Sequence, residues 1–202
     1  MEEFFTNIYE NNVWGNNNNS YYSGSSGGGS EIDYNTNYIK LLKMFISKNN
    51  IKNIVDLGCG DFKCGPLIYD DIDIKYIGYD TYKKVIDYNK IQHIDSKYTF
   101  IHLDFYTNKE EIIEGDLCIL KDVLQHWQMN EIYSFMDYLI ESKKFKYILL
   151  CNCCNQQVDN PDNSGRSIPL SINLFPLKKY NPVKLLNYNT KEISIIVRKS
   201  IE

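Results

Sequence analysis

Short apolar runs recur along the chain, and their spacing is the feature that most narrows the folds available to it. The runs are rich in Ile, Val, Leu, Tyr and Phe, and polar segments of helix length separate the first five. Strands that alternate with helices form right-handed βαβ units, whose parallel strands are covered by helices on both faces. The seven runs occupy residues 51–57, 74–80, 97–103, 116–120, 146–151, 183–188 and 192–198.

The last two runs lie too close together for a crossover helix. The segment NYNTK between them is typical of a hairpin turn, so the last strand is expected to run antiparallel to one neighbour. Ahead of the first run, Tyr38, Leu42 and Phe45 recur at helical spacing and predict a helix from Thr36. We therefore predict an α/β fold with a doubly wound sheet of seven strands, mostly parallel, formed by a single domain over residues 36–202.

The composition favours a globular protein and argues against a nucleic-acid partner. Hydrophobic residues make up 43% of the 202, and no apolar run approaches the roughly 18–20 residues that a membrane span requires. The net charge of −4 argues against a concentrated basic face for nucleic acid. The N-terminal stretch MEEFFTNIYE is too polar for a signal peptide, so we expect cytoplasmic localisation.

The six cysteines do not form a recognisable metal motif. The cluster CNCCN contributes Cys151, Cys153 and Cys154, and lacks the C-x2-C pairs of a zinc site. The other three lie in or beside predicted strands, where a cytosolic thiol behaves as a small hydrophobic group. We predict structural thiols and no metal, with metal binding and redox chemistry as the alternatives.

The first apolar run ends in a glycine loop, VDLGCGD at 55–61. In an open parallel sheet, ligands bind beyond the carboxyl ends of the strands. Gly58 and Gly60 would let a ligand approach the main chain, and the free N–H groups of a following helix would favour an anion. The dinucleotide pattern G-x-G-x-x-G fails because Lys63 takes the third glycine position. An acidic residue followed by G-x-G is instead the form found in methyl-donor folds.

Three aspartates close the first three predicted strands. Asp56 precedes the glycines, and Asp80 follows 20 residues after Gly60, where a carboxylate can accept hydrogen bonds from two ribose hydroxyls. Asp104 in FIHLDF is placed to accept a hydrogen bond from an adenine amino group. A single aspartate at a strand end can be a turn residue, but three in succession behind a glycine loop indicate a nucleoside site.

These motifs carry a resemblance to a known family. VDLGCGD, YIGYD, FIHLDF and DLCILKDVLQHW resemble, in order, the successive motifs of class I S-adenosylmethionine-dependent methyltransferases, over about residues 36–200. A smaller, mostly uncharacterised group of methyltransferases is more similar still, with an S-G-x-G-S arm and a C-G-D-F loop. The matching stretches are Trp14-Gly15, SGGGS at 26–30, CGDF at 59–62, KDVLQH at 121–126 and GRSIPLSINL at 165–174.

The resemblance implies a Rossmann-like class I methyltransferase fold that binds S-adenosylmethionine. Lys121 stands where the smaller group has an arginine, which puts in doubt any role that needs a planar guanidinium. The cofactor-binding residues that the motifs and the resemblance indicate are Asp56, Gly58, Cys59, Gly60, Asp80, Asp104, Phe105, Lys121, Trp14 and Ser30.

Residues 1–35 precede the domain, and residues 11–30 are low in complexity. Such a segment is compatible with a flexible linker. Trp14, Tyr21 and Tyr22 have no use in a linker, and a lid over a ligand would combine aromatic side chains with a flexible backbone. The resemblance favours the lid.

The segment 122–144, which follows the fourth run, is predicted to be one helix. Asp122 and His126 would then lie four residues apart on one face of its opening turns. If the methyl acceptor is a hydroxyl, its proton must leave, and we assign His126 as the base with Asp122 orienting it. In the alternative, Asp122 caps the helix and His126 is simply packed.

The long segment after the fifth run is expected to cover an acceptor site. Arg166 could bind an anionic group or form a structural ion pair, Asn173 could bond to a sugar or amide, and Tyr22 could add an aromatic contact. We predict methyl transfer to a small polar acceptor, such as a hydroxyl of a sugar or nucleotide-sugar, with a peptide or protein acceptor as the alternative. A non-catalytic S-adenosylmethionine-binding module and a nicotinamide-dependent oxidoreductase are the competing functions.

Overall fold

The computed structural model describes residues 1–155 and 167–198, which contain seven strands of one sheet. The strand order is β3-β2-β1-β4-β5-β7-β6, and β7 is antiparallel to both of its neighbours. This confirms the predicted fold class, including the antiparallel last strand. Contacts divide the chain into two compact units, Met1–Ile112 and Ile113–Glu202, and the N-terminal 35 residues belong to the first of them.

The first unit contains three parallel strands. β1 (Asn53–Leu57) pairs with β2 (Lys75–Asp80), which pairs with β3 (Tyr98–His102). All three fall inside the predicted runs. The helices and 3₁₀ turns of this unit are α1 (Glu2–Glu10), η1 (Gly28–Ser30), η2 (Asp33–Asn35), α2 (Thr36–Lys48), α3 (Gly65–Tyr69), α4 (Lys83–Gln92) and η3 (Lys109–Glu111).

An aromatic cluster fills the core of the first unit. Phe62 lies 4.7 Å from Tyr76 and 5.0 Å from Phe100, measured between ring centroids. Its backbone has φ +56°, and a Cβ on Gly65 would lie 2.1 Å from its ring, so that position admits no larger residue. Packing of this kind fixes the path of the chain that leaves the glycine loop.

The second unit carries the remaining strands. β4 (Gly115–Lys121) is parallel to β5 (Phe145–Cys153), and β5 is antiparallel to β7 (Lys191–Val197), which forms a hairpin with β6 (Val183–Tyr188). Trp127 and Phe135 pack edge to face in its core, with centroids 5.0 Å apart. Its helical segments are η4 (Leu124–His126), α5 (Met129–Glu141) and η5 (Leu177–Tyr180).

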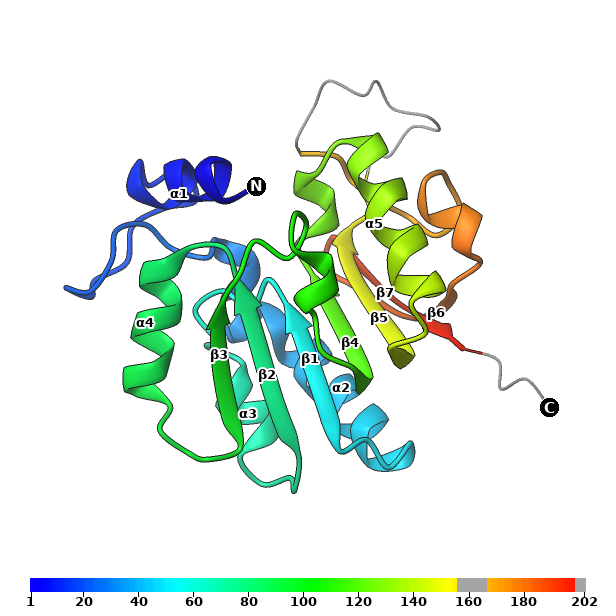
Figure 1. Cartoon of the computed structure of the whole chain (residues 1–202), viewed down its shortest axis with the longest axis horizontal. Helices are drawn as coiled ribbons and strands as arrows, with labels where there is room; N and C mark the ends of the chain where they lie inside the picture. Colours follow the sequence, from blue (N-terminus) through cyan, green and yellow to red (C-terminus); the bar gives the residue numbers. More distant parts are fainter. Residues whose placement is uncertain (156–166, 199–202) are drawn as a thin grey trace. The chain divides into compact units, whose positions relative to one another are not determined.

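Three features differ from the predictions. Residues 2–10 form a helix, α1, that was not predicted, and Figure 1 shows it beside α4 within the first unit. The connection from β3 to β4 holds only the three-residue turn η3 and no crossover helix. The helix predicted over 122–144 begins at Met129, because Gln128 and Glu131 form a capping box there.

None of the helices within residues 1–155 and 167–198 has the length and apolar character needed to cross a membrane.

Candidate functional site

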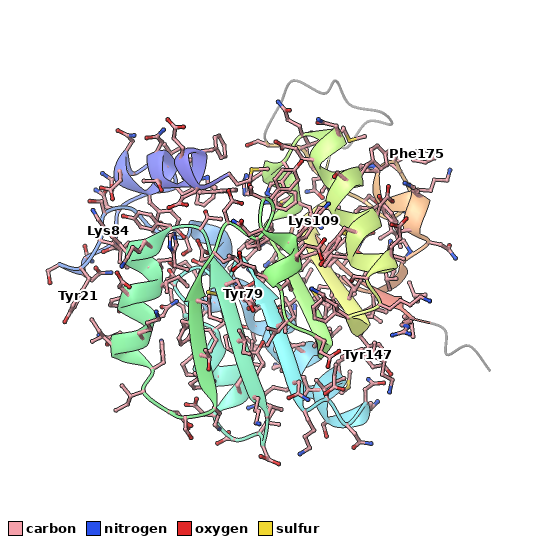
Figure 2. All side chains as sticks on the ribbon, viewed as in Figure 1. Tyr21, Tyr79, Lys84, Lys109, Tyr147 and Phe175 are labelled. Carbon is pink, nitrogen blue, oxygen red and sulfur yellow. The ribbon has the colours of Figure 1, made fainter. Side chains whose placement is uncertain are left out.

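The amides of the glycine loop are hydrogen-bonded within the chain. Those of Gly58 and Cys59 donate to the carbonyl of Tyr79, labelled in Figure 2, at 2.8 and 2.9 Å. The next two amides, of residues 60 and 61, donate to Asp80 Oδ2 and Ser26 Oγ, both at 2.9 Å. The amides of residues 58–61 are therefore engaged within the chain, and the predicted anion site at the start of the following helix stays a prediction.

Asp80 and Asn89 form hydrogen bonds with the backbone amide and the backbone carbonyl of Gly60, respectively. Asp80 Oδ2 accepts the Gly60 amide, while Oδ1 accepts the Tyr82 amide at 2.9 Å. Asn89 on α4 is fully buried and donates from Nδ2 to the Gly60 carbonyl at 2.7 Å. Burial raises the pKa of Asp80, although the two amides act in the opposite direction. The result is a loop fixed by hydrogen bonds beside a carboxylate that forms no ion pair with a lysine or arginine among the described residues.

Three buried oxygen atoms near this loop lack hydrogen-bond partners among the described residues. They are Oδ2 of Asp61, Oγ1 of Thr81 and Oδ1 of Asn89, on side chains of residues that are 5% exposed or less. Asp61 Oδ2 lies 3.4 Å from Lys63 Nζ, but burial still raises the pKa of this carboxyl. A buried acceptor left unpaired costs about 1–3 kcal/mol. The Asp61 and Asn89 oxygens are acceptors, so two acceptor atoms lack donors around Gly60, and the Thr81 hydroxyl can either donate or accept.

Asp56 and Asp104 also have partners inside the first unit. Asp56 Oδ2 accepts the hydroxyl of Tyr76 at 2.8 Å, which directs one oxygen toward the aromatic cluster. Asp104 Oδ2 accepts the amino group of Met1 at 2.9 Å and the amide of Glu2 at 3.2 Å. The proposed contacts of these carboxylates with a nucleoside stay predictions.

The N-terminal segment packs onto the glycine loop. Tyr9 of α1 stacks on Tyr82, with ring centroids 4.3 Å apart, and its hydroxyl is 2.9 Å from Ser26 Oγ. Glu10 accepts hydrogen bonds from the Tyr82 hydroxyl and from Lys84 Nζ, each at 2.7 Å, and Figure 2 labels Lys84 on α4. Residues 1–35 thus lie in place as a cover of this loop, and their opening as a lid stays a prediction.

The other predicted cofactor and acceptor residues of the first unit fall in three places. Cys59 is in the loop itself, and burial raises the pKa of its thiol. Phe105 is buried just after β3, at 4% exposure. Trp14, Tyr22 and Ser30 belong to the cover: Trp14 packs against Tyr9, Tyr22 is buried beside the same ring, and Ser30 Oγ donates to the Gly27 carbonyl at 2.7 Å.

In the second unit, Asp122 and His126 do not share a helical face. Asp122 has φ +60°, so its left-handed backbone ends the strand rather than opening a helix. His126 closes the 3₁₀ turn η4, and its Nε2 lies 3.4 Å from Gln125 Nε2. The i, i+4 argument that paired these residues is therefore wrong, and so is the alternative in which Asp122 caps the helix.

Asp122 is instead held by two lysines. Its Oδ2 accepts hydrogen bonds from Lys121 Nζ at 2.7 Å and from Lys191 Nζ. Burial would raise the pKa of Asp122, but the two ammonium groups outweigh it and hold the pKa below its ordinary value. Lys191 is 2% exposed, and burial, then Lys121, lowers its pKa. Lys121, predicted to bind cofactor, thus lies in a Lys-Asp-Lys cluster.

Two residues predicted to bind the acceptor remain, Asn173 and Arg166. Asn173 is exposed, and its amide lies 3.3 Å from Ser171 Oγ. Arg166 lies outside the described residues. Within 1–155 and 167–198, no group of three or more His, Cys, Asp and Glu side chains is placed to hold a metal ion.

Sequence reasoning missed three residues of these sites. Ser26 is the first residue of the SGGGS motif, but the sequence predicted no contact for it. Asn89 lies on the inner face of α4, where a buried amide in a polar helix is the available signal. Lys191 gave no local signal, because a lysine beside a hairpin turn is usually solvated.

Comparison with known proteins identifies the fold. No protein-family model matches the chain, and no curated protein matches it. The methyltransferase domain of the bacterial CtHen1-C superposes with TM-score 0.64 at 14% identity, over 83% of this chain and all of that one. An O-methyltransferase family protein from Burkholderia thailandensis gives 0.63 at 10% identity, over 83% of this chain and 57% of that one.

Human N-acetylserotonin methyltransferase, solved in complex with SAM, gives a TM-score of 0.60 at 14% identity, over 80% of this chain and 52% of that one. The chain therefore spans the whole bacterial domain but little more than half of the other two proteins. At these identities the likeness establishes the fold.

Proposed function

We propose that the protein is an S-adenosylmethionine-dependent methyltransferase that methylates a hydroxyl of a small polar acceptor, with a sugar or nucleotide-sugar as the best candidate. The observation that carries the proposal is the shortage of donors around Gly60, where buried acceptor atoms of Asp61 and Asn89 stand beside Asp80. A ligand that fits must be cationic or rich in N–H and O–H groups.

S-adenosylmethionine meets that requirement. Its ribose offers two hydroxyls to Asp80, and its ammonium group and sulfonium bring positive charge toward the buried carboxyls of Asp61 and Asp80. When bound, it would supply an electrophilic methyl group. A nicotinamide dinucleotide would bring a pyrophosphate to amides that already have partners at residues 58–61, so the same observation disfavours the oxidoreductase alternative.

The structural neighbours support the same proposal. They are a methyltransferase domain, an O-methyltransferase family protein and a methyltransferase complexed with SAM. The hydroxyl acceptor and its class are our inference from the polar character of the candidate residues.

Calorimetry tests the proposal directly. We expect S-adenosylmethionine and its demethylated product to bind with similar affinity, and NAD not to bind. Asp87→Asn is a matched control for Asp80→Asn, because Asp87 is a partly exposed carboxylate of α4 that pairs with Lys83 at the surface. Binding of NAD alone would overturn the proposal.

A donor-consumption assay separates catalysis from binding. The panel should contain neutral sugars, nucleotide-sugars and peptides, each incubated with the donor. Turnover with a sugar or nucleotide-sugar supports the proposed acceptor, and turnover with peptides alone would move it to the peptide class. Tight donor binding without turnover on any acceptor would favour the non-catalytic module.

A further inference from the structure

The Lys-Asp-Lys cluster of the second unit is asymmetric. Both ammonium groups bond to the same carboxylate oxygen, Asp122 Oδ2. The other oxygen, Oδ1, is buried and has no hydrogen-bond partner among the described residues. An unpaired carboxylate oxygen is costly to bury, so the cluster leaves a place for one hydrogen-bond donor.

The cluster lies at the edge of the sheet where ligands bind in this architecture. Lys121 ends β4, and Asp122 follows it. Because β7 is antiparallel to β5, the first residue of β7 lies opposite the last residue of β5, and Lys191 pairs with Cys153. The carboxyl ends of β4 and β5 and the start of β7 therefore share one edge of this unit.

We propose that Asp122 binds the O–H group of the methyl acceptor through Oδ1 and takes its proton, with Lys191 and Lys121 as positioning residues. This inference rests on the proposed function and replaces His126 as the base. The two lysines fix the carboxylate in one orientation, and its left-handed backbone at φ +60° turns the side chain out of the strand.

A weakly basic carboxylate is sufficient for this step. Methyl transfer to a neutral hydroxyl forms a C–O bond as the C–S bond breaks, leaves the sulfur neutral, and makes the acceptor oxygen a positively charged oxonium. That oxonium is a far stronger acid than any carboxylic acid, so its proton passes to Asp122 and the O–H electron pair stays on oxygen. The proton then leaves to water, which restores the carboxylate.

The charged and titratable groups around Asp122 come from four strands. Lys121 of β4 and Lys191 of β7 are the cations that contact it. Cys151 of β5 is buried, and burial and then Asp122 raise the pKa of its thiol to about 11. Tyr188 of β6 lies behind that thiol, at 3.6 Å from its sulfur. With its pKa raised in this way, the thiol does not ionise in the range where a carboxylate titrates.

The pH dependence of kcat/KM tests the assignment. With Asp122 as base, the acid limb should lie below about pH 4, whereas an ordinary imidazole would place it near about 6.5. Lys191→Met removes one cation, so the limb should move upward by about one pH unit, while Lys191→Arg should keep it near its original place. A limb that stays fixed in Lys191→Met would overturn the inference.

Two controls accompany this profile. Lys184→Met removes a lysine that pairs with a buried carboxylate on the neighbouring strand, Glu192 at 3.0 Å, and should leave the limb unchanged. His126→Gln should also leave it unchanged, and the loss of an imidazole limb in that variant would restore His126 as the base.

A measurement without donor or acceptor completes the test. In protein carrying ¹³C-labelled aspartate carboxyl groups, Asp122 should titrate below its ordinary value and shift upward in Lys191→Met. Titration at the ordinary value, unchanged by the substitution, would overturn the inference. Calorimetry separates the two proposals: failure to bind S-adenosylmethionine overturns the proposed function, whereas normal binding with an unshifted limb overturns only the role of Asp122.

Discussion

Asp80 and Asp122 are both aspartates at the carboxyl ends of strands, yet their surroundings are opposite. Asp80 accepts the backbone amides of Gly60 and Tyr82, forms no ion pair with a lysine among the described residues, and has its pKa raised by burial. Asp122 accepts two ammonium groups, which lower its pKa in spite of burial. Asp80 therefore has too little positive charge beside it, whereas Asp122 contacts two ammonium groups and its single negative charge can neutralise only one of them.

The difference separates two kinds of site. A carboxylate fixed by amides among unpaired acceptor atoms is suited to a ligand that brings hydroxyls and positive charge. A carboxylate fixed by two cations stays ionised and keeps one oxygen for a donor. The unpaired acceptor atoms near Asp80 and the Oδ1 atom of Asp122 therefore each lack a hydrogen-bond donor that the proposed ligand would supply.

The largest expected effect concerns folding stability. Asp122→Asn leaves two ammonium groups, one of them buried, without a carboxylate, and should lower the free energy of unfolding by about 3–5 kcal/mol. Asp80→Asn removes a carboxylate that burial already disfavours, and should lower it by about 1 kcal/mol. Urea unfolding at pH 7 measures both. Equal losses would mean that the two surroundings do not differ as described.

Donor affinity should show the reverse order. The proposed function assigns Asp80 two hydrogen bonds to ribose hydroxyls, each worth about 1.5 kcal/mol, so we expect Asp80→Asn to weaken S-adenosylmethionine binding about 100-fold. Asp122→Asn should change it by less than about threefold, provided that the variant folds. Isothermal calorimetry measures the ratio, and a larger loss in Asp122→Asn would reverse the roles of the two aspartates.

A glycine substitution should loosen the cover without touching either aspartate. Gly24 has φ +72°, and a Cβ there would lie 2.3 Å from the Tyr9 carbonyl. Gly24→Ala should therefore destabilise the packing of residues 1–35 by about 2 kcal/mol. Limited proteolysis should cleave this segment at least tenfold faster, while Gly28→Ala, which meets nothing within 4 Å, should behave as wild type. Equal cleavage in both variants would argue against a cover packed through Gly24.

The smallest effect is on the pH dependence of stability. Because the pKa of Asp122 is lowered on folding, its contribution is present above about pH 3.9 and is lost as pH falls through the lower folded value. The raised pKa of Asp61 acts oppositely, since stability falls as pH rises from about 3.9 through the folded value.

Asp61→Asn should therefore increase the gain in stability between pH 4 and pH 6 by about 1 kcal/mol relative to wild type. Urea midpoints at the two pH values measure the gain. A smaller gain in the variant would mean that burial does not raise the pKa of Asp61.

Strand positions were predictable because burial imposes a local pattern. The runs at 51–57 and 192–198 contain β1 and most of β7, since a strand buried on both faces must be nearly all apolar. The glycine loop and its aspartates were also predictable, because they are local sequence that directly follows the end of a strand.

The cluster around Asp122 was not predictable in the same way. The apolar stripe through Val123 and Trp127 favours a helix, and the competing signal was the pair Gln128 and Glu131, a capping box that marks a later start. Lys191 lies 69 residues further along the chain than Asp122, and the contact between them depends on how β7 pairs with β5. Side-chain partners of that kind follow from register, which a hydrophobic pattern does not specify to the residue.

The length of the turn between β6 and β7 determines where the Lys191 side chain lies. Lys191 is the first residue after a tight turn, so an insertion of one residue at Asn189 or Thr190 would rotate the ammonium group to the opposite side of the ribbon. Relatives that differ only in turn length would then keep the same architecture and lose the ammonium group that orients Asp122, so we expect the length of this turn to govern the ionisation of that carboxylate.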